Sequence, residues 1–246
     1  MEFEGKAAIV TGASGGLGRA IAVALGTAGA QVGLVARSRE GREETRRLIG
    51  QPDARVFCTD LRDEQAIAQL GASVTANLGP VDILVNCAGV WHDERTRFHG
   101  PRLLETPVER ISEVLEVGVR APLWLARMLL PGMVQRGAGK ILQISAAFGA
   151  PRDGVGWVQY YVANKALDAF TEALAVELRE HKIQVNCIAP VFVATDAVRR
   201  FYASEIQSEQ ALDPLDVAQL ALFLLSSRAD HISGQVIAVR SKDDHG

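Results

Sequence analysis

The sequence has no strong excess of either charge, few cysteines and no long apolar run. Its formal net charge of −3 at pH 7 gives no electrostatic reason to expect nucleic acid or an anionic membrane as a partner. No apolar stretch approaches the length of a transmembrane helix. The acidic start, Met1 to Glu4, has no apolar signal-peptide region. These absences predict a cytoplasmic protein without nucleic-acid or membrane partners.

The few cysteines also exclude some chemistry. Cys58, Cys87 and Cys187 are in no paired or metal-like spacing, and no His, Cys and Asp cluster has the spacing of metal ligands. Each cysteine lies in an apolar, strand-like context. We therefore expect buried free thiols in a reducing compartment, and no metal site.

What the chain does have is a large apolar content in an alternating pattern. Its 246 residues are 48% apolar, and they show no linker or internal repeat, so one domain over 1–246 is expected. Alternating strands and helices predict an α/β fold with a parallel sheet covered on both faces. The expected strands lie near 6–11, 31–36, 54–58, 81–86, 139–145, 183–189 and 235–239. The expected helices lie near 16–28, 40–49, 63–77, 107–130, 160–180 and 214–227.

A glycine-rich turn follows the first strand. Thr11-Gly12-Ala13-Ser14-Gly15-Gly16-Leu17-Gly18 joins an apolar strand to an apolar helix. In that position the backbone N–H groups at the helix N-terminus can face a pyrophosphate. The spacing G-x-x-x-G-x-G alone is weak, because a plain glycine turn is about as common.

Two further motifs strengthen this interpretation. Tyr161 and Lys165 are four residues apart on an apolar helix, so the phenol and the ammonium share a face. Asn86-Cys87-Ala88-Gly89 ends the fourth strand. In this order the three motifs resemble the patterns T-G-x-x-x-G-x-G, N-N-A-G and Y-x-x-x-K of the short-chain dehydrogenase/reductase family, from Gly5 to about Val239. The resemblance implies a single Rossmann-type, doubly wound parallel sheet of about seven strands, with helices on both faces.

The resemblance also implies a dinucleotide cofactor. NAD-preferring relatives carry an acidic residue where this chain has Ala36, and Arg37 follows, whose guanidinium can pair with a 2′-phosphate. NADP(H) is therefore expected over NAD(H), although Gly15 replaces a second basic residue and Arg37 could simply be a solvated surface side chain. The implied cofactor-binding residues are Gly12, Ser14, Gly15, Gly16, Leu17, Gly18, Arg37, Asp60, Leu61, Asn86, Ala88, Gly89, Tyr161, Lys165, Pro190 and Thr195.

Catalytic roles follow from the same resemblance. Tyr161 would be the general acid for carbonyl reduction. Lys165 would lower the phenol pKa from about 10 and would bond the nicotinamide ribose. The plain alternative is a Tyr and a Lys that merely share a helix face.

The chain departs from the family pattern at several positions. The catalytic serine of the family aligns with Ala146, and Ser145 precedes it. Strand alternation points Ser145 away from the site, unless the slightly longer connection to Tyr161 rotates it inward. Gly118 replaces the asparagine that bends the long helix and holds a water against the lysine. Val191 replaces a glycine beside the nicotinamide. The last residues, from Arg240 to His245, are mostly charged, where relatives pack this end near a subunit interface. The expected assembly is a homodimer through the long helices or the homotetramer usual in the family.

Three functions remain open. The first is NADPH-dependent reduction of a carbonyl or C=N group in a small substrate. The second is a net non-redox reaction such as cyclisation, elimination or isomerisation on the same scaffold, and the third is non-catalytic dinucleotide binding. Segments 90–106 and 191–212 could line a pocket, and several aromatic residues could favour a bulky or ring-bearing substrate. These residues are Trp91, His92, Phe98, Phe148, Trp157, Tyr160, Phe192, Phe201 and Tyr202.

Overall fold

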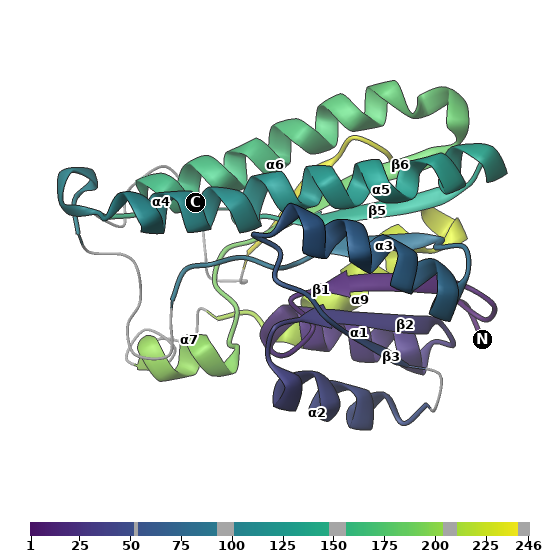
Figure 1. Cartoon of the computed structure of the whole chain (residues 1–246), viewed down its shortest axis with the longest axis horizontal. Coiled ribbons are helices and arrows are strands. Elements are labelled where there is room, and N and C mark those ends of the chain that lie inside the picture. The colour runs from purple at the N-terminus through teal and green to yellow at the C-terminus, as the bar shows by residue number, and fades with distance from the viewer. Residues whose placement is uncertain (52–53, 93–100, 148–155, 204–210, 241–246) are drawn as a thin grey trace.

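A parallel sheet of seven strands forms the centre of the molecule (Figure 1). The computed structural model describes residues 1–51, 54–92, 101–147, 156–203 and 211–240. The strand order is β3-β2-β1-β4-β5-β6-β7, with every pair parallel, so the order reverses between β1 and β4. The doubly wound sheet expected from the sequence is therefore confirmed. The strands are β1 (Ala7–Thr11), β2 (Gln31–Ala36), β3 (Arg55–Cys58), β4 (Ile83–Asn86), β5 (Gly139–Ile144), β6 (Ile183–Pro190) and β7 (Val236–Val239).

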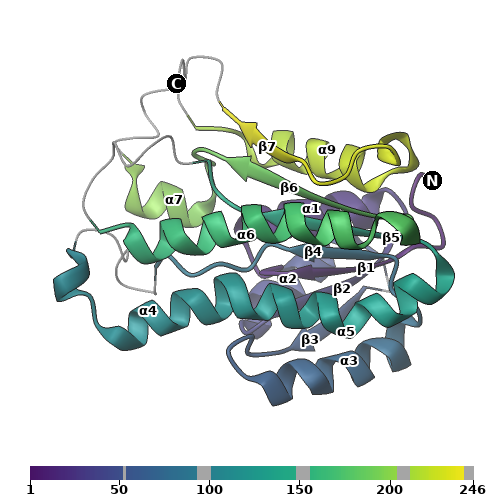
Figure 2. The same cartoon turned by 90° about the horizontal axis from the view of Figure 1, so that it is seen from above.

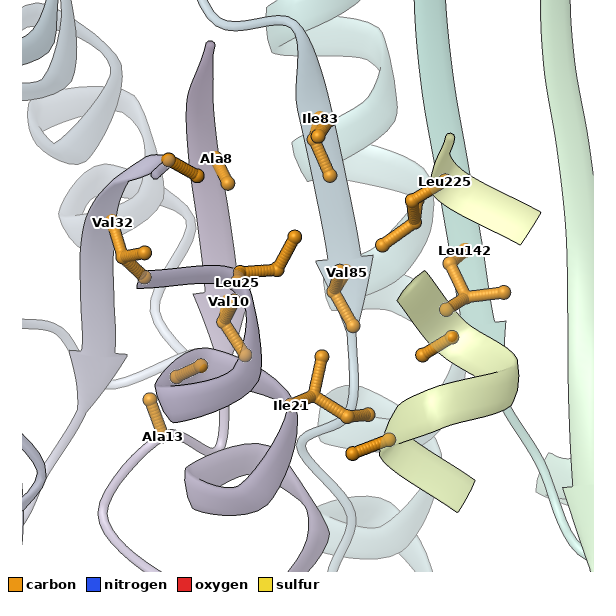
Figure 3. Packing of buried hydrophobic residues seen from close by; sticks show 14 of the residues in the cluster. Ala8, Val10, Ala13, Ile21, Leu25, Val32, Ile83, Val85, Leu142 and Leu225 are labelled. Atoms are coloured by element: carbon orange, nitrogen blue, oxygen red, sulfur yellow. The ribbon is translucent and has the colours of Figure 1, made fainter. Parts of the chain in front are cut away.

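Helices cover both faces of this sheet because its strand residues alternate between two apolar layers. Val10 packs with α1 and α9 on one side, while its neighbour Ile9 packs with α3, α5 and α6 on the other (Figures 1 and 2). Figure 3 shows the first layer, in which Ile21 and Leu25 of α1 face Val85 and other strand residues. The helices are α1 (Gly16–Thr27), α2 (Arg39–Ile49), α3 (Glu64–Leu78), α4 (Val108–Leu115), α5 (Ala121–Arg136), α6 (Val158–Glu177), α7 (Asp196–Phe201) and α9 (Pro214–Leu225).

Several helices begin where the local sequence offers a cap. The side chains of Ser38, Asp63 and Asp213 accept hydrogen bonds from the backbone N–H groups that open α2, α3 and α9. Gly50 and Gly137 end α2 and α5 in the left-handed conformation. Short 3-10 turns η1 (Leu103–Glu105), η3 (Arg179–His181) and η4 (Ser227–Ala229) complete the connections.

The helix expected over 107–130 is not continuous. It divides into α4, a π-helical turn η2 (Glu116–Arg120) and α5, which runs on to Arg136 despite Pro131. The π-helical turn contains Gly118, where the helix ladder is locally widened. The sequence periodicity missed this interruption because the residues on both sides keep a helical phase. It also missed α7, a six-residue helix capped by Thr195.

The expectation for the cysteines is only partly right. All three are free thiols, and Cys187 is buried as expected, but Cys87 is half-buried and Cys58 is exposed at the end of β3. Within the described ranges, no helix is both long and apolar enough to cross a membrane.

Candidate functional site

A cleft of about 1540 Å³ opens beyond the carboxyl ends of the strands. Its walls are the glycine turn after β1, the ends of β2, β4, β5 and β6, one face of η2, one face of α6 and part of α7. This is where ligands bind in open parallel sheets, beside the point at which the strand order reverses. In the described part of the chain, no group of three or more His, Cys, Asp or Glu side chains could hold a metal ion.

The glycine turn forms one end of the cleft and is built for close backbone approach. Gly12 has a φ of 68°, and a Cβ there would lie 3.0 Å from the Cα of Ala88. A Cβ on Gly18 would collide with the carbonyl of Gly12. A Cβ on Gly15 would meet nothing within 4 Å, so this position stays open toward the cleft. The turn therefore presents bare backbone at the start of α1, as a pyrophosphate requires.

Thr11 ties this turn to the segment after β4. Its hydroxyl accepts hydrogen bonds from the backbone N–H groups of Cys87 and Ala88, each at 3.0 Å, and donates to the carbonyl of Val85 at 3.4 Å. Ala88 and Gly89 line the cleft beside the turn. Asn86 is buried, and neither atom of its amide has a hydrogen-bond partner among the described residues.

The ends of β2 and β3 line the next part of the cleft. Ala36 is buried, whereas the Arg37 side chain is 60% exposed, with only a 3.9 Å ion pair to Glu113. Asp60 and Leu61 also line the cleft. The Arg62 guanidinium donates to both carboxylate oxygens of Asp60 and holds the pKa of that carboxyl below its ordinary value.

The segment after β6 forms another wall of the cleft and reaches the glycine turn, where a Cβ on Gly16 would lie 3.4 Å from the Thr195 side chain. Pro190, Val191 and Thr195 line it. The Thr195 hydroxyl accepts a hydrogen bond from the N–H of Val198 at 3.3 Å and so caps α7. The sequence-expected residues of the glycine turn, the β2 and β3 ends, the β4 loop and the β6 loop therefore gather around one cleft. Their cofactor roles remain predictions.

The face of α6 toward the cleft differs from the one that the motif names. Tyr160, Ala163, Asn164 and Leu167 line the cleft, at the i, i+3, i+4 and i+7 spacing of one helix face. Tyr161 and Lys165 are not among its lining residues. Tyr161 and Lys165 share a face of the helix by their spacing, but spacing alone does not say which face meets the cleft.

Lys165 has another partner. Its Nζ lies 2.8 Å from the Oδ2 of Asp168, its side chain is 46% exposed, and the Asp168 hydrogen bond raises its pKa. The Lys165 ammonium is 5.8 Å from the centre of the Tyr161 ring. Tyr161 and Lys165 therefore lie near each other, but the Lys165 ammonium forms its ion pair with the Asp168 carboxylate.

Ser145 borders the cleft, yet its hydroxyl is turned to the same carboxylate. The Ser145 Oγ donates to the Oδ1 of Asp168 at 2.7 Å and accepts from the Cys187 thiol at 3.2 Å. The longer connection does not rotate this side chain to the substrate side, so the alternation expected for the strand persists. Ala146 lines the cleft with no hydroxyl to offer.

Tyr160 is a phenol of the cleft wall, contributed by α6. Desolvation raises its pKa to about 12, and the Asn164 side chain opposes this only in part. The Asn164 amide also donates to the Tyr160 carbonyl at 2.8 Å. The Trp157 and Tyr160 ring centres are 5.3 Å apart.

Gly118 of η2 lines the cleft beside this face of α6. A Cβ at Gly118 would be 3.2 Å from the Cβ of Ala163, so the π-helical turn packs directly on α6. A side chain at this position would require Ala163 to give way by a few tenths of an ångström.

Aromatic side chains surround the mouth of the cleft. Trp91 packs edge-on against His92 and Phe201, and Phe192 packs edge-on against Tyr202. Phe98 and Phe148, which were also expected here, lie outside the described residues. The expected aromatic residues that line the cleft are Trp91, His92, Trp157, Tyr160, Phe192 and Tyr202.

Comparison with known proteins agrees with this geometry. The family model described as "short chain dehydrogenase" matches residues 6–206. The chain belongs to the short-chain dehydrogenase family. It is 30% identical to 7alpha-hydroxysteroid dehydrogenase of Escherichia coli over 97% of this chain and 94% of that protein. It is 33% identical to L-xylulose reductase of Mus musculus over 96% of this chain and 95% of that protein.

A solved structure extends the likeness to three dimensions. The 3-ketoacyl-(acyl-carrier-protein) reductase from Brucella melitensis, complexed with NADH, superimposes with a TM-score of 0.88 at 28% identity, covering 98% of both chains. Dependence on NAD(P) is typical of this oxidoreductase family. The protein is therefore a short-chain dehydrogenase/reductase enzyme with a single Rossmann-type sheet.

Proposed function

We propose that this enzyme uses NADP(H) to reduce a carbonyl or C=N group in a small, bulky or ring-bearing metabolite. The observation that carries the proposal is the continuity of the cleft. It runs from the bare glycine turn at the start of α1, past Arg37, to a phenol on α6. A dinucleotide cofactor and a proton donor can therefore meet in one space.

The residues present fit a dinucleotide. Gly15 lines the cleft with open space where a side chain would stand, so a pyrophosphate can approach the backbone there. Arg37 supports NADP(H), because its guanidinium is exposed at the cleft and its ion pair with Glu113 is long. Asp60 and Leu61 would flank the adenine, and Pro190 and Thr195 would meet the nicotinamide end.

Reduction of a carbonyl or C=N group needs a hydride and a proton. When bound, NADPH supplies the hydride. A phenol of the protein supplies the proton to the substrate oxygen or nitrogen as charge develops there. The family motif assigns this role to Tyr161 with Lys165 as its partner, whereas the cleft wall carries Tyr160.

The substrate end of the cleft favours an apolar, ring-bearing molecule. Trp91, Phe192 and Tyr202 present aromatic surface there, and Ala146 offers no hydroxyl near the reacting end. Aromatic walls with few polar groups are typical of sites for bulky apolar ligands. This composition argues against a small, highly hydroxylated substrate.

One experiment separates the proposed reaction from its rivals. The protein is incubated with NADPH and a panel of cyclic, aromatic and short-chain carbonyls and imines, and loss of the nicotinamide absorbance is followed. We expect turnover of bulky ring-bearing members. NADPH binding without consumption of the cofactor would contradict the proposal and favour dinucleotide binding alone.

A net non-redox reaction is the second candidate, and it has its own support. The cleft carries Ala146 at the position of the family's serine and Gly118 at the position of its asparagine. Losing a preorganised hydrogen-bond donor to a reacting oxygen typically costs about 10²–10³ in rate. Conversion of a panel member to an isomer, with no change in nicotinamide absorbance, would establish this alternative.

We also propose that the enzyme acts in the cytoplasm as a homodimer or homotetramer. Leu104, Val108 and Leu123 are exposed on η1, α4 and α5. An apolar surface on these helices suits contact with a second copy. Light scattering during size-exclusion chromatography should give two or four times the chain mass of 26.4 kDa. A monomer would contradict this assembly.

A further inference from the structure

We propose that Arg62 and Glu113 set how strongly the cleft favours a 2′-phosphate, because they control how freely the Arg37 guanidinium can meet it. This inference rests on the proposed use of NADP(H) and adds two residues that the sequence motifs do not name. Neither is among the described residues that line the cleft, so both act through the side chains in front of them. They are positioning residues, and Arg37 is the group that touches the phosphate.

Four charged side chains form a continuous cluster beside the ends of β2 and β3. The Glu113 Oε1 atom, on α4, lies 3.9 Å from Nη1 of Arg37 and 3.3 Å from Nη1 of Arg62. The Arg62 Nε and Nη2 atoms donate to the Asp60 carboxylate at 3.0 and 2.6 Å. This four-charge cluster therefore contains two cations and two anions, and its formal charges cancel.

Arg62 neutralises both carboxylates of the cluster. Its hydrogen bonds to Asp60 hold the pKa of that carboxyl below its ordinary value, so Asp60 is ionised near pH 7. Its remaining nitrogen, Nη1, faces Glu113. The side chains of Asp60 and Glu113 are only 35% and 25% exposed, so solvent screens their charges less than those of surface carboxylates. Without Arg62, two carboxylates would lack their cation next to Arg37.

Arg37 is the loosely held member of the cluster. Its side chain is 60% exposed, and its 3.9 Å ion pair with Glu113 is near the upper limit for such a contact. Because Glu113 has a closer partner in Arg62, Arg37 can turn to a phosphate without leaving the Glu113 carboxylate unpaired. Arg62 therefore makes Arg37 available to a ligand, whereas Glu113 competes with that ligand for the same guanidinium.

The two residues should act on a 2′-phosphate in opposite directions. Removing the Arg62 cation changes the formal charge of the four-charge cluster from zero to −1, and removing the Glu113 anion changes it from zero to +1. A phosphate bound at Arg37 responds to that change because it is itself highly charged. A ribose 2′-hydroxyl carries no charge and should respond much less. A ligand without the 2′-phosphate is therefore the internal reference for every variant.

Two small probes measure this response without turnover. Adenosine 2′,5′-bisphosphate and adenosine 5′-monophosphate differ only in the 2′-phosphate, and their affinities are measured by isothermal titration calorimetry at low ionic strength. Arg62→Ala should weaken the bisphosphate about tenfold and change the monophosphate less than about threefold. Glu113→Gln should strengthen the bisphosphate about three- to tenfold. The double variant restores a neutral cluster and should return close to wild type, a coupling that independent sites do not show.

The chain offers matched controls for both changes. Arg47→Ala removes an arginine that pairs with Glu44 on α2 through the same two nitrogens, away from the cleft. Glu109→Gln removes an exposed carboxylate one turn earlier on α4 that is not among those raising the pKa of Arg62. Each control should keep the ratio of the two affinities within about twofold. Arg62→Lys retains the cation and should hold the bisphosphate within about threefold of wild type.

The outcomes separate this inference from the proposed cofactor. Equal weakening of both probes by Arg62→Ala would make that residue merely structural and overturn the inference, as would weaker bisphosphate binding by Glu113→Gln. A wild-type protein that binds both probes equally would reject the preference for NADP(H). Glu113→Gln still decides in that case, and also if Arg62→Ala does not fold: a gain confined to the bisphosphate supports the inference, and no gain overturns it.

Discussion

Two neighbouring residues at the end of β5 have opposite roles. Ala146 lines the cleft, whereas the hydroxyl of Ser145 donates to the buried Asp168. Ser145 thus supports the carboxylate that holds Lys165, and it acts through α6 rather than on a substrate. A hydroxyl donor to a buried carboxylate is a stabilising contact because the charge is otherwise undersolvated.

Replacing Ser145 tests this role. Ser145→Ala should lower the free energy of unfolding by about 1.5–3 kcal/mol, the usual range for a hydrogen bond to a charged group. Turnover should change less than about tenfold. Urea denaturation and steady-state kinetics measure the two effects. A drop of about 10²–10³ in kcat would mean that Ser145 is the missing donor to the substrate.

The proposed preference for NADP(H) depends on Arg37. Arg37→Ala should weaken NADPH binding about tenfold and leave NADH binding nearly unchanged, because only NADPH carries the 2′-phosphate. Arg39→Ala, an exposed arginine two residues on, is the matched control and should change neither affinity. Fluorescence titration with both cofactors gives the answer. Tighter binding of NADH by the wild-type protein would contradict the assignment.

The phenol of Tyr160 should also affect stability at high pH. Its folded pKa of about 12 lies above the ordinary value of about 10, so the neutral phenol stabilises the fold. That contribution is complete below about pH 10 and is lost as pH rises toward about 12. Tyr160→Phe should therefore lose stability less steeply over this interval. Denaturant unfolding at a series of pH values measures the slopes, and identical slopes would show that the phenol is not desolvated.

At the scale of whole elements, the contact between η2 and α6 sets the shape of the cleft wall. Gly118 and Ala163 allow the π-helical turn to approach α6 closely, and the helix phase that results turns Tyr160 and Asn164 inward. The glycine is costly within a helix, by about 1 kcal/mol relative to alanine. Its gain is the close packing of two helices beside the site.

Filling the Gly118 position should disturb that packing. Gly118→Val should lower the free energy of unfolding by about 1–3 kcal/mol, as overpacking usually does. Gly132→Ala is the matched control in α5, because its added Cβ would approach only the flexible end of Arg136. That variant should be neutral or slightly more stable. Chemical denaturation of both variants tests the contact, and a Gly118→Val protein as stable as wild type would show that the helices have room.

Most helices and strands could be predicted from the sequence, but the face that α6 turns toward the cleft could not. Alternating apolar runs located all seven strands, and the glycine turn, the β4 loop and the β6 loop were placed at one edge by the rule for parallel sheets. The motif spacing of Tyr161 and Lys165 correctly put them on one face of α6, but spacing alone does not say which face meets the cleft. That depends on the long-range contact of Ala163 with Gly118 and on the Asp168 network, which the sequence does not reveal.

At the scale of the whole molecule, the sheet brings together segments that are far apart in the chain. The strand order reverses between β1 and β4, and the cleft lies beside this reversal, where open parallel sheets bind ligands. The β5 and β6 ends extend it toward α6 and α7. One edge of the sheet therefore gathers the described residues that line the cleft, and these include the residues proposed to bind the cofactor and the substrate.

A crystal structure of the NADPH complex is the most direct test of this account. We expect the pyrophosphate at the glycine turn, the 2′-phosphate at Arg37 and the nicotinamide between Thr195 and the face of α6 that carries Tyr160 and Asn164. A dinucleotide bound elsewhere would contradict the account.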